Sequence, residues 1–138
     1  MSNPSKKKGT AAETRVRKYF NDNGLECKRK ALAGSKDLGD LCLHLPDGSE
    51  VTVEVKAGKQ TWNYTRGKRN EWKRQTIVEA ENSECAALLV IVRYRRNFVD
   101  TEVWWPEPKS FEDDVNLPPC WKMMYIDDFV NKVKGSEK

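Results

Sequence analysis

The chain has 138 residues and a mass of 15.9 kDa, which predicts one domain large enough to bury a hydrophobic core. Apolar residues make up 38% of it and charged residues 33%, and its longest apolar run, residues 86–92, is too short to cross a bilayer. The lysines near the N-terminus have no apolar stretch behind them, unlike those of a secretory signal. We therefore expect no membrane contact and a cytoplasmic location, in a prokaryotic cell or in the host cell if the protein is viral.

Cysteine and histidine, the residues that usually bind zinc, are sparse along the chain. The four cysteines form no CxxC pair, which argues against zinc and predicts reduced thiols that are buried or inert. They are Cys27, Cys42, Cys85 and Cys120. His44 is the single histidine, and we expect it to be structural or at most a neighbour of a functional site. Any metal site should therefore consist mainly of carboxylates.

Charge is distributed unevenly between the two halves of the chain. Residues 1–75 contain 17 Lys/Arg and 9 Asp/Glu, a net charge of +8, whereas residues 76–138 contain 8 and 12, a net charge of −4. A basic half in a small domain indicates a polyanionic partner. Nucleic acid is favoured over a membrane surface because no basic amphipathic helix is evident.

The N-terminal third predicts an arm, a helix and a strand. Residues 1–9 are expected to form a mobile basic arm, and residues 10–138 a single domain. A helix should begin at Thr10, which forms a capping box with Glu13, and end at Asn23-Gly24. Residues 25–32 are then expected to form a short edge strand.

Two runs of alternating hydrophobicity, residues 40–45 and 51–56, flank turn residues and predict an antiparallel hairpin. Because side chains alternate along a strand, one face of this hairpin is apolar. The opposite face carries Asp40, Cys42, His44, Thr52, Glu54 and Lys56.

The remaining elements complete an α/β pattern. A loop rich in cations and aromatic residues precedes a helix predicted over residues 70–82. Residues 86–92 are continuously apolar and rich in β-branched residues, which is typical of a buried central strand. A short strand over residues 101–105 and a helix over residues 127–133 follow. The order α-β-β-β-α-β-β-α predicts a mixed sheet flanked by helices.

Asp40, Glu54 and Lys56 are expected to lie together on one face of the hairpin. Neighbouring carboxylates repel each other, and Mg²⁺ prefers such an oxygen-only set of ligands. A water made more acidic by the metal can attack a phosphodiester, and Lys56 can hold that water or stabilise charge in the transition state. The competing interpretation is a solvated sheet face with an incidental ion pair.

These residues resemble the PD-(D/E)XK nuclease superfamily and, more narrowly, archaeal-type Holliday junction resolvases. The resemblance covers about two-thirds of the chain, departs at Gly39, where the superfamily name has proline, and is lost in the tail around Trp104-Trp105. It rests on Gly9, Glu13, Arg29, Gly34-Ser35, Asp40, Glu54 and Lys56, in the family's order. It implies a restriction-endonuclease-like fold and a homodimer that cleaves four-way junctions or other branched DNA with Mg²⁺, for which Mn²⁺ substitutes, and without an organic cofactor.

The resemblance also implies roles for single residues. Glu13 becomes a metal ligand with Asp40 and Glu54, although it can equally be a capping residue or an ion-pair partner of Arg17. Contacts with phosphate are implied at Arg29 and Ser35. Gln75 corresponds to a helper residue, with exposed helix surface as the alternative.

The loop after the hairpin is expected to bind DNA by stacking on bases and neutralising phosphates. The residues concerned are Lys59, Trp62, Tyr64, Arg66, Lys68 and Arg69. The alternative is a surface loop whose aromatic side chains fold back onto the core. Two other functions stay open: a related nuclease that acts on flaps, ends or single strands, and a non-catalytic module that binds DNA by its structure.

Overall fold

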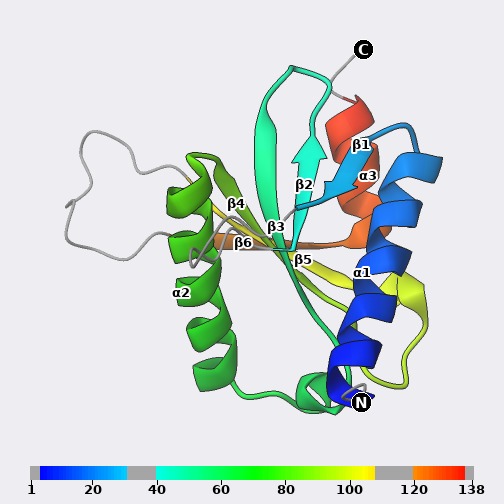
Figure 1. Ribbon diagram of the computed structural model, residues 1–138, viewed down its shortest axis with the longest axis vertical. Coiled ribbons are helices and arrows are strands. Elements are labelled where there is room, and N and C mark those ends of the chain that lie inside the picture. The colour runs from blue at the N-terminus through cyan, green and yellow to red at the C-terminus, as the bar shows by residue number, and fades with distance from the viewer. Residues whose placement is uncertain (1–3, 31–39, 108–119, 136–138) are drawn as a thin grey trace.

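Six strands form one mixed sheet in the computed structural model, which describes residues 4–30, 40–107 and 120–135 (Figure 1). The strands are β1 (Glu26–Arg29), β2 (Leu41–His44), β3 (Glu50–Lys56), β4 (Ala86–Ile91), β5 (Glu102–Pro106) and β6 (Trp121–Tyr125). The helices are α1 (Pro4–Asp22), α2 (Arg66–Ser83) and α3 (Ile126–Gly135). All neighbouring strands are antiparallel except β3 and β4, which α2 connects. The expected α/β fold is confirmed.

The β2–β3 hairpin is confirmed together with its apolar face. Leu41 pairs with Val53, and Leu43 pairs with Val51. All four side chains are buried, because α1 and α3 cover this face of the sheet (Figure 1). Gly48 has a φ of +90° and supplies the left-handed backbone that the turn requires.

The opposite face of the hairpin is covered by α2 (Figure 1). Thr52 and Glu54 on β3 are only 0% and 5% exposed. The side of α2 toward the sheet is likewise buried, at Trp72, Thr76, Glu79 and Ala80. The interpretation as a solvated surface is therefore wrong for the part of this face around Glu54, which lies between the sheet and α2.

The first helix begins at Pro4 rather than at Thr10, so residues 4–9 of the expected arm belong to α1. Thr10 therefore lies inside the helix and is not its N-cap. The helix ends at Asp22, before Gly24 with its φ of +84°, as the sequence predicts. Residues 1–3 lie outside the described residues.

The second long helix also begins earlier than predicted, at Arg66 rather than at residue 70. The hydroxyl of Thr65 accepts a hydrogen bond from the backbone N–H of Lys68 at 3.1 Å and so caps the helix. Arg66, Lys68 and Arg69, which we expected in a loop, therefore lie in the first turns of α2.

The tail adds one strand that the sequence analysis missed. β6 pairs antiparallel with β5 and forms an edge of the sheet. Trp104 and Trp121 from these strands pack beside Trp72 of α2, in a small aromatic core. The element order is thus α-β-β-β-α-β-β-β-α, and the unmatched tryptophans of the tail serve to extend the sheet.

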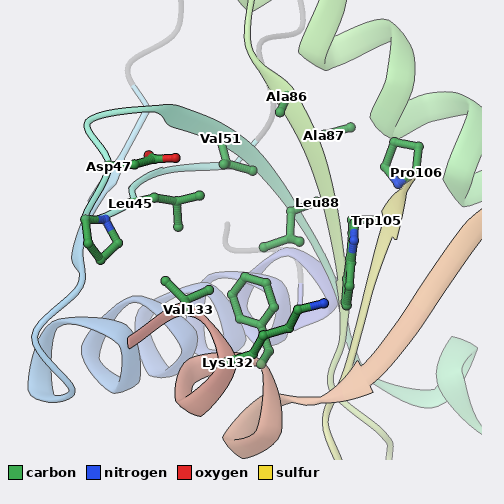
Figure 2. Close-up of a pocket in the computed structure, with 12 residues that line it drawn as sticks. Leu45, Asp47, Val51, Ala86, Ala87, Leu88, Trp105, Pro106, Lys132 and Val133 are labelled. Atoms are coloured by element: carbon green, nitrogen blue, oxygen red, sulfur yellow. The ribbon is translucent and has the colours of Figure 1, made fainter. Parts of the chain in front are cut away.

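A pocket of about 440 Å³ opens on the apolar side of the sheet, between the hairpin turn and α3 (Figure 2). Leu45 and Val51 line it from the hairpin, and Trp105 and Val133 line it from β5 and α3. Among the described helices, none is long and apolar enough to span a membrane.

Candidate active site

Asp40 is fixed against β3 by backbone hydrogen bonds at the start of the hairpin. Its N–H donates to the carbonyl of Val53 at 3.0 Å, and its Oδ2 accepts from the N–H of Val55 at 2.8 Å. The side chain is therefore held beside Glu54, as the hairpin pattern predicts.

Glu54 and Lys56 lie within ion-pair distance of each other on the same, largely buried face of β3. The Nζ of Lys56 lies 3.4 Å from Oε1 of Glu54, and the two side chains are 15% and 7% exposed. Lys56 also donates to Oε1 of Gln75 on α2 at 2.9 Å. The structure thus brings Gln75, the expected helper residue, into contact with the lysine.

Glu79 on α2 completes this polar cluster and was missed by the sequence analysis. It accepts a hydrogen bond from Nε2 of Gln75 at 2.9 Å and shares a further hydrogen bond with Glu54. Its side chain is only 1% exposed. The available signal was its spacing, because Glu79 follows the buried Trp72 and Thr76 at seven and three residues, on one side of the helix.

Burial and the neighbouring acids make Glu54 harder to ionise. Burial raises the pKa of Glu54 to about 10, and its hydrogen bond to Glu79 and the charges of Asp40 and Glu79 act in the same direction. The charge of Lys56 lowers this pKa but does not outweigh the other effects. The cluster is therefore short of positive charge, which is the condition that a bound cation relieves.

Glu13 on α1 reaches the same cluster from the other side of Asp40. Burial, the charge of Asp40 and a hydrogen bond with it raise the pKa of Glu13 to about 7, although Arg29 lowers it. Nη2 of Arg29 lies 3.7 Å from the carboxylate of Glu13 and 3.3 Å from the hydroxyl of Thr14. Glu13 thus faces Asp40 and Arg29. Ser35, the other expected phosphate contact, lies outside the described residues.

The predicted DNA-binding residues fall into two groups. Four are exposed, namely Lys59, Trp62, Arg66 and Lys68. Tyr64 instead donates to the buried carboxylate of Glu102 and packs against Trp72 at a ring distance of 5.3 Å. Arg69 lies over the ring of Trp104 at 4.5 Å. Tyr64 and Arg69 therefore fold back onto the core of the protein, as in the alternative interpretation of this segment as a surface loop.

A second group of potential ligands lies at the turn end of the same hairpin. Among residues 4–30, 40–107 and 120–135, one set of three His, Cys, Asp or Glu side chains has ligand atoms that all lie within 4.8 Å of one another. This set consists of Cys42, His44 and Glu50. The carboxylates around Asp40 are not gathered this closely. Glu50 was not singled out by the sequence analysis, although alternation along β3 puts it on the same face as Thr52 and Glu54.

No family model matches the sequence, and no curated protein matches it. Among solved structures, the chain is similar to that of Hjc, a Holliday junction resolvase from the archaeal hyperthermophile Archaeoglobus fulgidus. The TM-score is 0.54 at 16% sequence identity, over 88% of this chain and 99% of that chain. The chain has a restriction-endonuclease-like fold. Since this similarity establishes the fold alone, the activity must be argued from the site.

Proposed function

We propose that the protein is a metal-dependent endonuclease of the PD-(D/E)XK type that cleaves branched DNA, above all four-way junctions. The observation that carries the proposal is the buried contact between the carboxyl group of Glu54 and the ammonium of Lys56, which lies beside Asp40 and under α2. Burying an acid and an ammonium together costs desolvation energy, so we attribute this contact to function rather than to stability. The fold of the resolvase structure supports the same proposal.

The residues present fit a hard divalent cation. Hydrogen bonds between carboxyl groups join Glu13 to Asp40 and Glu54 to Glu79, and such pairs require a shared proton or a cation. The donors are all oxygen, which favours Mg²⁺ or Mn²⁺. Asp40 and Glu54 would hold the ion, with Glu13 as a further ligand. When bound, it supplies a more acidic water and neutralises charge on the phosphate.

Lys56 is the residue that would act on the reacting phosphate. Its ammonium is directed by two partners, Glu54 and Gln75, and is 15% exposed. A compact positive charge held in this way can orient the attacking water or stabilise charge as the phosphodiester opens. Gln75 is then a positioning residue, because it fixes the lysine through its carbonyl oxygen.

Exposed cations of the same half of the molecule offer contacts for the DNA backbone. Arg29 lies beside the carboxylate cluster, and Lys59, Arg66 and Lys68 lie on the segment that leads from β3 into α2. A junction has two strands to cut, and a homodimer with two-fold symmetry would present two matching sites. Flaps, ends and single strands are the alternative substrates for the same chemistry.

Cleavage of a labelled four-way junction, a flap and a linear duplex, each with Mg²⁺ and with chelator, tests the proposal. We expect paired nicks in the junction that require the metal. Glu81→Gln, an exposed acid on α2, serves as the control and should cut like the wild type. Binding without cleavage under all metal conditions would favour the non-catalytic module, and preferential cutting of the flap would reassign the substrate.

A further inference from the structure

Two thiols, an imidazole and a carboxylate lie near one another at the turn end of the hairpin, away from Glu54. We refer to them as the turn-end cluster: Cys42, His44, Glu50 and Cys85. The register of the strands brings these side chains together, because His44 pairs with Glu50 in the hairpin. In the parallel pair, Val51 lies beside Ala86, so that Cys85 is brought beside Glu50.

Three of these side chains lie close enough to share a metal ion, because one ligand atom from each of Cys42, His44 and Glu50 lies within 4.8 Å of the others. Sγ of Cys42 lies 3.8 Å from Nε2 of His44, and Nδ1 of His44 lies 3.6 Å from Oε1 of Glu50. Sγ of Cys85 lies 4.0 Å from Oε2 of Glu50. Zinc bonds of about 2.0–2.3 Å separate neighbouring ligand atoms by roughly 3.3–3.8 Å. His44 must therefore turn to offer one nitrogen to the ion, and Cys85, which reaches the set through Glu50, must move toward Cys42 and His44.

We propose that the turn-end cluster binds one zinc ion, at a site separate from the carboxylates around Asp40. Two thiolates, an imidazole and a carboxylate suit zinc, whereas Mg²⁺ takes oxygen ligands. A histidine binds zinc through one nitrogen and donates the N–H of the other to an oxygen. The ion would join β2 and β3 to the start of β4.

Lys30 separates this site from the carboxylates. Its ammonium donates to the hydroxyl of Thr52 at 2.7 Å and to that of Ser83 at 2.8 Å. Thr52 lies opposite Cys42 and two residues before Glu54, so the lysine reaches the sheet between the two sets of ligands. A positive charge at this position disfavours sharing of one ion between them.

Titration of metal-free, reduced protein with Co²⁺, a spectroscopic substitute for zinc, tests the proposal. We expect one equivalent to bind with a thiolate-to-cobalt charge-transfer band that Zn²⁺ removes. Cys42→Ser and His44→Asn should weaken binding at least ~100-fold, since losing even an outer partner of a ligand costs ~10–100-fold. Cys120→Ser, which alters an exposed cysteine outside the cluster, is the matched control and should bind like the wild type.

Three results would overturn the proposal: a wild type without the thiolate band, loss of the band in Cys120→Ser, or its loss in Asp40→Asn. Because a cluster variant can fail to fold, alkylation of the wild type gives a second measurement. Zn²⁺ should protect Cys42 and Cys85 at least tenfold against iodoacetamide and leave Cys120 reactive. Equal reactivity of all three thiols in zinc would contradict the site. DNA cleavage is not needed for either measurement.

Discussion

The two ends of the β2–β3 hairpin present different donor atoms on the same face of the sheet. The end near Asp40 gathers carboxylates with a buried lysine, whereas the turn end gathers thiols, an imidazole and a carboxylate. The difference in burial is equally clear, because Glu54 is 5% exposed and the cluster at the turn is half-buried or exposed. One strand pair can therefore carry hard and soft ligands without mixing them, provided that a residue such as Lys30 stands between.

The largest effect should come from removing charge at the carboxylate end. Asp40→Asn and Glu54→Gln keep the shape of the side chain but remove a proposed metal ligand. The rate of junction cleavage should therefore fall by ~10³-fold or more, since the loss of a single electrostatic donor already lowers a rate by ~10²–10³-fold. DNA binding in chelator should persist. Gel assays of cutting and binding measure both. Cleavage by either variant at the rate of the wild type would contradict the assignment.

Lys56→Ala should lower the maximal cleavage rate by ~10²–10³-fold without shifting the Mg²⁺ midpoint, because the role proposed for the ammonium is to act on the reaction and not on the metal. Lys56→Arg should rescue only in part, since a planar guanidinium does not replace a compact charge. Titration of Mg²⁺ against rate separates the two roles. A normal maximal rate reached only at much higher Mg²⁺ would make Lys56 part of the metal site.

A third prediction concerns stability and pH. The pKa of Glu13 rises from 4.5 to about 7 on folding, so the folded state favours the protonated carboxyl. The stability that protonated Glu13 contributes to the folded state is fully present below pH 4.5 and is lost as the pH rises through 7. In chelator, the free energy of unfolding should fall by ~1–2 kcal/mol over this range, a value reduced for partial exposure to solvent. Glu13→Gln should flatten the curve from urea unfolding. Parallel curves for the two proteins would show that Glu13 does not titrate in this way.

The smallest effects should come from the exposed residues beyond β3. Arg66→Ala and Lys68→Ala should each lower the slope of log affinity against log salt by ~1, on every DNA form. Trp62, which is 56% exposed, is placed to stack on an unpaired base. Trp62→Ala should reduce the preference for junction over duplex. Equal loss on both substrates would leave Trp62 as a packing residue.

The hairpin and its two faces could be predicted because their signal is local. Alternation along two adjacent strands determines which side chains share a face, and this pattern alone is enough to place Asp40 beside Glu54. β6 could not be predicted in this way, since its sequence from Trp121 to Tyr125 lacks alternation and its pairing depends on β5. Which side chains of β6 are half-buried depends on the elements that pack against the strand.

The missed parts of the sites depend on contacts between distant segments. Glu79 approaches Glu54 only because α2 packs across the sheet, and a glutamate in a charged helix resembles a solvent-exposed residue. Cys85 approaches Glu50 only through the parallel pairing of β3 and β4. The start of α2 was predicted too late for a different reason. The capping residue Thr65 is followed directly by basic residues, and a run of basic residues is equally typical of a DNA-binding loop.

The order of the strands has a consequence for how the chain folds. Every strand pairs with its neighbours in sequence, so most pairings close short loops and can form early. The parallel pairing of β3 with β4 is different, because the chain must first pass through the whole of α2. That slower step also brings Glu79 to Glu54 and Gln75 to Lys56. A nascent chain that has formed only the hairpin therefore holds Glu54 and Lys56 without the helix whose side chains contact them.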